Sequence, residues 1–197
     1  SPMPKITDRT VDSLNQEIRV KLAYPDSSRD RQGFNPIIYP DLVFDYQVRV
    51  HPQGTSFKVI VDLDEPLPTE WIGKVGFNLE LFPGDLFGKS WKMDDEQGIF
   101  PRQANGPMYY DEDGNLQIKP MAEGKILQVV PESPLQHVTF QNIGEGNLQL
   151  LDGRGLHNNS WFIIRSLIPA NVTENAIEWL IEPNIVKEWQ YESVVQL

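Results

Sequence analysis

The sequence predicts an all-β protein: an antiparallel β-sandwich, jelly-roll-like, with long irregular loops and little helix. Apolar residues recur at every second position in many short runs, which is the pattern of half-buried strands. The 16 prolines and 14 glycines are scattered among these runs, where they supply turns. No segment shows the period of about 3.6 residues expected of a convincing amphipathic helix. Short strands separated by such turns are typical of sandwiches and barrels.

The first strands are expected at 17–22, 45–51 and 57–63, where apolar and polar residues alternate. Gln53-Gly54 lies between the last two runs, which predicts a β-hairpin with a loop of roughly four to six residues. The best helical stretch is 10–19. Acids near its start suit a helix N-terminus, although its apolar residues form only one weak stripe.

Further strands are expected downstream, separated by turn residues such as Gly and Asn. Their ranges are 75–81, 116–118, 125–130, 138–140, 148–151, 161–167 and 176–181. Two long segments, 24–39 and 82–110, show no regular pattern, and loops of this length usually have a binding or packing role. We predict that 82–110 is a lid whose aromatic rings mostly pack on the sandwich.

Composition disfavours several kinds of function. Lys and Arg total 17 against 28 acids, a net charge of −11, which argues against a nucleic-acid partner and an anionic membrane surface. The absence of cysteine excludes disulfides, thiolate metal sites and a cysteine nucleophile. No apolar run approaches the roughly 20 residues needed to span a bilayer, so no membrane span is expected.

The histidines and serines form no catalytic motif. His51, His137 and His157 stand alone, without the spacing of a metal site, and His157 in its Gly-rich loop is the most site-like of the three. No G-x-S-x-G nucleophile motif and no complete phosphate-binding loop occurs. We therefore predict no catalytic residue, no metal and no cofactor.

The carboxylates are abundant but not arranged as a site. Asp62 and Asp64 share a strand face, but they lie at the expected strand end and are interpreted as solvated. The acidic run 94–96 is interpreted as a solvated charge run, and the Asp-rich segment 111–115 as a hairpin turn in place of half a calcium loop.

The segment 82–110 combines aromatic rings with amide and cationic side chains, as sugar-binding sites do. Three interpretations stay open: the rings pin the segment onto the sandwich, they stack on a glycan, or they contact a neighbouring domain. The candidates for a carbohydrate or domain-interface site are Trp91, Phe100, Arg102, Gln103, Asn105, Tyr109 and Tyr110.

Several stretches resemble a segment N-terminal to the catalytic domain in Bacteroidetes-type glycoside hydrolase family 9 proteins, the endoglucanase-like group. They are GFNLELFP at 76–83, FGKS at 87–90, GIFPRQ at 98–103, NGPM at 105–108, WFIIRSLIP at 161–169 and YESVVQL at 191–197. The family's helical catalytic barrel does not fit in 197 strand-rich residues, so no catalytic residue is carried over.

The resemblance implies a non-catalytic N-terminal accessory domain of a secreted polysaccharide-degrading enzyme. We expect residues 1–197 to form one sandwich domain, a fragment of a longer multidomain protein whose signal peptide is missing from this sequence. The implied partners are the downstream catalytic domain and a glycan, and the implied location is secreted, periplasmic or cell-surface.

Two other functions stay open. The first is a self-contained β-sandwich glycosidase or lyase that uses a carboxylate pair drawn from Glu80, Asp85, Asp94 and Asp95. The second is a cell-surface protein-interaction domain, which would expose a large apolar patch. The sequence does not indicate the glycan, the oligomeric state or the strand order.

Overall fold

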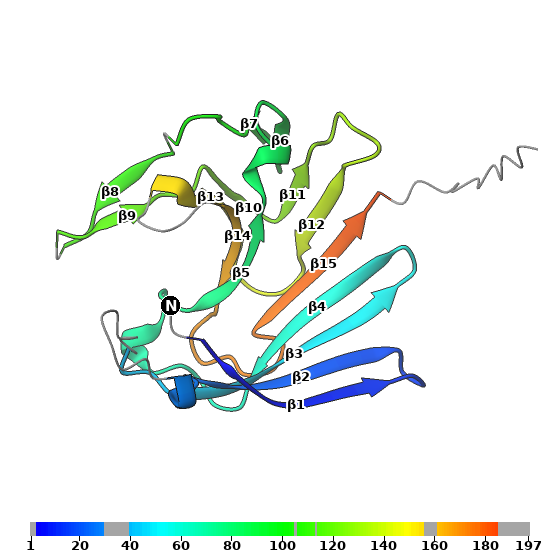
Figure 1. Cartoon of the computed structure of the whole chain (residues 1–197), viewed down its shortest axis with the longest axis vertical. Helices are drawn as coiled ribbons and strands as arrows, with labels where there is room; N and C mark the ends of the chain where they lie inside the picture. The colour runs from blue at the N-terminus through cyan, green and yellow to red at the C-terminus, as the bar shows by residue number, and fades with distance from the viewer. Residues whose placement is uncertain (1–2, 30–39, 105, 113, 156–160, 185–197) are drawn as a thin grey trace, which may run out of the picture.

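The structure is a computed structural model that describes residues 3–29, 40–104, 106–112, 114–155 and 161–184. These ranges contain fifteen β-strands and four short 3-10 helices, and every strand pair is antiparallel. The predicted all-β, sandwich-like fold is therefore confirmed (Figure 1).

The larger layer is a nine-stranded sheet that bends along its length (Figure 1). Its first four strands follow the chain as a meander, and the others come from distant parts of the sequence. In spatial order they are β1 (Lys5–Asp12), β2 (Glu17–Tyr24), β3 (Phe44–Gln53), β4 (Ser56–Leu63), β15 (Ile177–Pro183), β12 (Val138–Asn142), β11 (Ile126–Val129), β6 (Ser90–Met93) and β7 (Glu96–Ile99).

The smaller layer is a four-stranded sheet, and a separate two-stranded hairpin lies apart from both layers (Figure 1). The four strands, in spatial order, are β10 (Ala122–Gly124), β13 (Leu148–Asp152), β14 (Phe162–Leu167) and β5 (Gly76–Leu81). The hairpin consists of β8 (Met108–Tyr110) and β9 (Leu116–Ile118). The 3-10 helices are η1 (Ser27–Arg29), η2 (Thr69–Trp71), η3 (Pro83–Asp85) and η4 (Gly153–Gly155).

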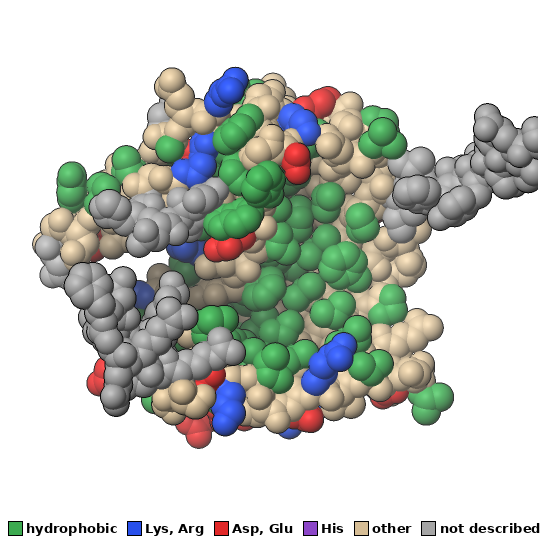
Figure 2. Space-filling view, viewed as in Figure 1, with side chains coloured by type: hydrophobic (Ala, Val, Ile, Leu, Met, Phe, Trp, Pro, Cys, Tyr) green, Lys and Arg blue, Asp and Glu red, His purple; other side chains and the backbone are tan. Residues whose placement is uncertain are grey.

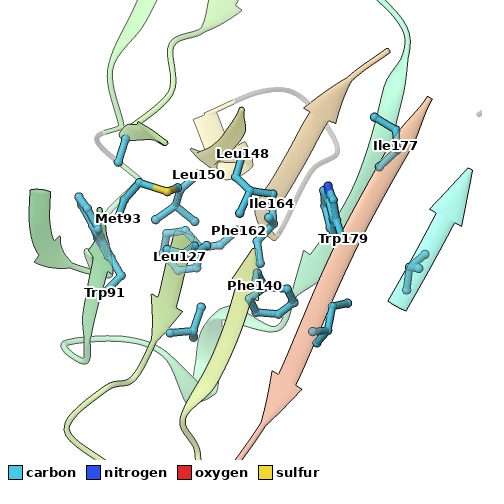
Figure 3. Packing of buried hydrophobic residues seen from close by; sticks show 14 of the residues in the cluster. Trp91, Met93, Leu127, Phe140, Leu148, Leu150, Phe162, Ile164, Ile177 and Trp179 are labelled. Carbon is cyan, nitrogen blue, oxygen red and sulfur yellow. The ribbon is translucent and has the colours of Figure 1, made fainter. Parts of the chain in front are cut away.

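The hydrophobic core lies between the two sheets, where the inward residues of both layers meet (Figure 3). Trp179 of β15 is fully buried, and its ring meets Phe77 of β5 edge-on with centroids 5.0 Å apart. The Trp179 indole Nε1–H donates a hydrogen bond to Ser166 Oγ of β14 at 2.9 Å. Alternate residues of a strand point to opposite faces, so the period-two pattern explains why every second side chain is buried in this core.

The β3–β4 hairpin was expected from the sequence and is present, with a shorter turn than predicted. Gln53 pairs with Ser56, so only Gly54 and Thr55 form the turn. Gly54 has a φ of +63°, a conformation that glycine adopts without steric cost.

The segment 10–19, the best helical stretch of the sequence, forms no helix and lies in the β1–β2 hairpin. Val11 pairs with Ile18, and the turn between the strands is closed by the Asp12 carboxylate. Asp12 accepts hydrogen bonds from the backbone N–H groups of Leu14 at 3.0 Å and Asn15 at 3.1 Å. Asp side chains favour turns in this way, and the cross-strand pairing outweighs the weak helical stripe.

The prediction of one long irregular loop over 82–110 is wrong, because the segment contributes β6, β7 and β8. Trp91 and Met93 of β6 face the core, and β6 pairs with β11, more than thirty residues downstream. Strands β6 and β7 have four residues each, too few for alternation to be recognised without the partner strand. Residues 30–39 of the other expected loop lie outside the described part of the chain.

Candidate functional site

The most prominent surface feature is a concave face that the smaller sheet covers only in part. We use "concave face" for the side of the nine-stranded sheet that is turned toward the four-stranded sheet. The smaller sheet ends at β5, which contacts β15 and borders the concave sides of β3 and β4. The concave sides of β1 and β2 lie beyond it, and Figure 2 shows apolar side chains gathered in an open hollow in this view.

The residues of this open region follow from the strand pairing. Val48 of β3 lies opposite Val61 of β4 and Val20 of β2, so the three side chains share the concave face. Exposure increases toward the sheet edge: Val61 is 3% exposed, whereas Ile18 on β2 and Val11 on β1 are exposed apolar residues. Large exposed apolar surfaces on soluble proteins usually mark binding sites.

Two cavities lie at opposite ends of β5, where it approaches the larger sheet. The first, of about 120 Å³, is lined by Phe44, Tyr46, Val61, Leu63, Phe77 and Ile168. The second, of about 320 Å³, is lined by Leu81, Leu86, Lys89, Val129, Gln136 and Val138. Both cavities are mainly apolar and open to solvent, so they are suited to hydrocarbon or ring groups.

Aromatic rings gather at the first cavity. Phe44 and Tyr46 stack with centroids 5.3 Å apart, and Tyr24 of β2 packs against Phe44 at 5.5 Å. Burial, followed by the neighbouring Tyr24, raises the pKa of the Tyr46 hydroxyl above its ordinary 10.0. Tyr46 therefore stays protonated, and neutral, over the physiological range.

The convex side of β3 and β4 carries a network of polar side chains that the sequence did not predict. Asp62 was expected to be solvated, but only 7% of the residue is exposed. Arg49 of β3 donates two hydrogen bonds to the Asp62 carboxylate, from Nε at 2.7 Å and from Nη2 at 3.1 Å. Gln47 and the backbone N–H of Asn175 donate two more. This arrangement is a structural ion pair, because both carboxylate oxygens of Asp62 accept hydrogen bonds from protein groups.

The pKa of Asp62 results from opposing effects. Burial alone would raise the pKa, but the hydrogen bonds from Arg49, Asn175 and Gln47 and the positive charge of Arg49 hold it below the ordinary 3.8. Beside this pair, His51 Nε2 lies 2.6 Å from Glu17 Oε2, on the same convex side. His51 is thus half-buried and paired with a carboxylate.

A second buried ion pair, also missed by sequence reasoning, joins Asp152 and Arg154. Their Nη2–Oδ2 distance is 2.8 Å, and the Asp152 side chain has no exposed surface. The Arg154 guanidinium also donates to the backbone carbonyls of Pro101, Arg102 and Gln103, and it lies 4.5 Å from the ring centroid of Phe162. A D-G-R-G sequence looks like a surface turn, so only the tertiary contacts identify Arg154 as the residue that holds 101–103 in place.

The predicted site residues do not come together at one place. Trp91 is 7% exposed and Phe100 is fully buried, so both belong to the core. Phe100 packs against Phe162 with centroids 4.8 Å apart. This position agrees with the interpretation that rings pin the segment onto the sandwich.

The other predicted residues lie at or near the surface. Arg102 and Gln103 are exposed, with their carbonyls bonded to Arg154. Tyr109 and Tyr110 are 51% and 72% exposed on the β8–β9 hairpin. Asn105 lies outside the described residues.

The four acids considered for a glycosidase are all exposed: Glu80, Asp85, Asp94 and Asp95. The Asp94 carboxylate has a structural role, because it accepts hydrogen bonds from the backbone N–H groups of Lys125 at 2.8 Å and Ile126 at 2.9 Å. Across the described ranges, no group of three or more His, Cys, Asp or Glu residues is placed to hold a metal ion. His157 lies outside these ranges.

No helix in the described part of the chain has both the length and the apolar character needed to cross a membrane. Neither a protein-family model nor a curated protein matches the sequence. Among solved structures, the chain is similar to the crystal structure of the Slr1438 protein from Synechocystis sp. PCC 6803, with a TM-score of 0.39 and 9% sequence identity. The alignment covers 90% of this chain and 64% of that one, so the chain spans less than two thirds of that protein. The two proteins share too little for a function to be transferred.

Proposed function

We propose that this chain is a non-catalytic accessory domain of a secreted glycoside hydrolase, which supports the catalytic domain and binds glycan. The observation that carries this proposal is the chemical character of the concave face. On β2, β3 and β4 it presents aliphatic and aromatic side chains, where a hydrolase would need a pair of carboxylates. The resemblance to segments that precede family 9 catalytic domains supplies the enzyme class.

The distribution of charge supports a binding role. Glycosidases place two carboxyl groups roughly 5–10 Å apart in a cleft, one of them with a raised pKa. Here Asp62 and Asp152 are paired with arginines in structural contacts, and the four acids considered above are exposed. A domain of this kind contributes by contact with a neighbouring domain or with a polysaccharide.

The β8–β9 hairpin is the surface that best suits a glycan. Tyr109 and Tyr110 are exposed there, and flat rings of this kind stack on the apolar faces of pyranose units. The hairpin also exposes Met108 and Leu116, and this apolar composition equally favours the second candidate function, a cell-surface protein-interaction domain.

The experiment is to incubate the purified chain with a panel of cellulosic and hemicellulosic polysaccharides. We expect no release of reducing ends, and calorimetric binding to at least one soluble oligosaccharide of the panel. Turnover that is lost on substitution of one carboxylate would contradict the non-catalytic assignment. Absence of any glycan binding would remove the glycan partner and favour the protein-interaction alternative.

A further inference from the structure

The part of the concave face that lies beyond β5 has a cationic end and an apolar body. We propose that it binds an amphiphile with one carboxylate and an unbranched hydrocarbon chain, that is, a long-chain fatty acid. This site is separate from the glycan-binding hairpin, and it does not depend on the accessory role proposed above.

One row of side chains crosses four strands on this face. Arg9 of β1 lies opposite Val20 of β2, Val20 opposite Val48 of β3, and Val48 opposite Val61 of β4. Residues directly opposite one another in a sheet project from the same face, so Arg9 stands at the free end of a row of three valines. Neighbouring strands are about 4.8 Å apart, so the row from Arg9 to Val61 is about 14 Å long.

A second row runs beside the first and completes a groove. It consists of Ile6, Leu22, Tyr46 and Leu63, again paired across β1 to β4. Tyr46, Leu63 and Val61 also line the cavity of about 120 Å³ that lies against β5. The two rows therefore give an apolar path from the open edge of β1, where a bulge separates Ile6 from Asp8, to the cavity against β5, and a hydrocarbon chain can lie along this path.

Arg9 indicates the charge of the head group. Among the described residues, no carboxylate forms an ion pair with Arg9 and no acceptor takes a hydrogen bond from it, although the chain carries 28 acids against 17 basic residues. The acidic neighbours on its own hairpin, Asp8 and Glu17, alternate onto the convex side. A guanidinium binds a carboxylate through two parallel hydrogen bonds, so Arg9 complements an anionic head at the solvent end of the groove.

Aliphatic side chains on this path favour hydrocarbon over sugar. Pyranose sites use exposed aromatic rings and several polar groups for the hydroxyls. Here Val20, Leu22 and Val48 form the middle of the path, and aromatic rings lie only at its closed end, in the cavity lined by Phe44, Tyr46 and Phe77. Figure 2 shows the green hollow with Lys or Arg side chains at its lower border.

The test is isothermal titration of the full chain with octanoate, decanoate and dodecanoate, each below its micelle concentration. We expect saturable binding that strengthens by about two- to fourfold with each added methylene, because each one removes apolar surface from water. Dodecanol and dodecyltrimethylammonium report on the head group: both should bind more weakly than dodecanoate.

Arg9→Gln tests the proposed cation. It should weaken dodecanoate binding about tenfold, the loss expected for a charge-assisted hydrogen bond, and leave dodecanol binding unchanged. Lys21→Gln is the matched control, because Lys21 lies on the adjacent strand, is exposed, and projects from the convex side. It removes the same charge and should leave both affinities unchanged.

Val20→Thr tests the path without changing the side-chain volume greatly. The added hydroxyl should weaken both dodecanoate and dodecanol, while the circular dichroism spectrum and the Tm stay close to those of the parent chain. The proposal is overturned if dodecanoate does not bind, if Arg9→Gln has no more effect than Lys21→Gln, or if all three amphiphiles bind equally. It is also overturned if light scattering shows a dimer that Val20→Thr dissociates, because a second copy would then occupy the groove.

Discussion

The indole Nε1–H of Trp179 donates a hydrogen bond to the hydroxyl of Ser166 at 2.9 Å, and this bond joins the two sheets inside the core. Ser166 in turn donates to the backbone carbonyl of Asn147 at 3.0 Å. Both residues are almost completely buried, so neither polar group has water as an alternative partner. The pair fixes the position of β14 over β15 as well as filling space.

Ser166→Ala should therefore lower the free energy of unfolding by about 1–3 kcal/mol, because the Trp179 N–H is left buried without an acceptor. Urea denaturation followed by tryptophan fluorescence measures this loss. Thr55→Ala in the exposed β3–β4 turn is the control and should change stability by less than about 0.5 kcal/mol. Equal effects of the two substitutions would show that the hydrogen bond contributes nothing.

Arg154→Met should lower stability by about 3–5 kcal/mol, because it leaves the Asp152 carboxylate buried without its partner. Arg154→Lys should rescue little of this loss, since a lysine cannot reproduce the planar fork that reaches Asp152 and three carbonyls. The double variant Asp152→Asn/Arg154→Met removes both charges. It should be more stable than the sum of the two single losses predicts, and strict additivity would contradict a coupled pair.

Stability should fall in acid through Asp62. Its pKa in the folded protein is lower than the ordinary 3.8, so the native state favours the charged form and the stabilisation is complete above that value. It is lost as the pH falls below 3.8 and through the lower folded pKa. Asp62→Asn should be less stable than the parent chain at pH 7, and the difference should shrink as the pH is lowered toward 2. Chemical denaturation across this range checks the sign, and a constant difference would exclude Asp62 as the cause.

Gly98→Ala should disturb the packing of Trp91. A Cβ at position 98 would lie 2.5 Å from Cζ2 of the Trp91 ring, so the ring has to move within the core, at a loss of about 1–3 kcal/mol. Gly144→Ala is the matched control, because its nearest atom would be 3.4 Å away. Near-ultraviolet circular dichroism and the Tm distinguish the two variants, and an unchanged tryptophan signal in Gly98→Ala would refute the predicted contact.

Glycan binding, if located on the β8–β9 hairpin, should depend on Tyr110 and not on Trp91. Tyr110→Ala removes an exposed ring and should weaken oligosaccharide binding about tenfold without changing the Tm, as expected for the loss of one stacking contact. Trp91→Ala empties a core position and should lower stability by about 3–5 kcal/mol. Binding that survives Tyr110→Ala would place the glycan elsewhere.

Much of the sheet structure could be predicted from local pattern. The alternating runs expected at 17–22, 45–51 and 57–63 coincide with β2, β3 and β4, because a half-buried strand must alternate whatever its partner is. Five strands were not predicted: β1, β6, β7, β8 and β10. β1 is exposed along nearly its whole length and has little apolar pattern, and β6 is only four residues long.

The candidate sites depended still more on long-range contacts. Trp91 and Phe100 look like free aromatic residues in a loop, but pairing with β11 and packing on Phe162 bury them. Asp62 and Arg154 look solvated until Arg49 and the carbonyls of 101–103 are brought to them. The position of Arg9 at the end of a valine row appears only when four strands are aligned.

The sequence by itself determined that the chain is built of strands and that its acids form no recognisable motif, since both follow from residue type and near-neighbour spacing. The tertiary structure alone decided the strand order, the difference in size between the nine-stranded and the four-stranded sheet, and the apolar face left open beyond β5. Alternation states which residues of a strand share a face, but the strand that pairs with it can come from a segment more than a hundred residues away, as β15 does beside β4, and that pairing is set by packing of the whole core.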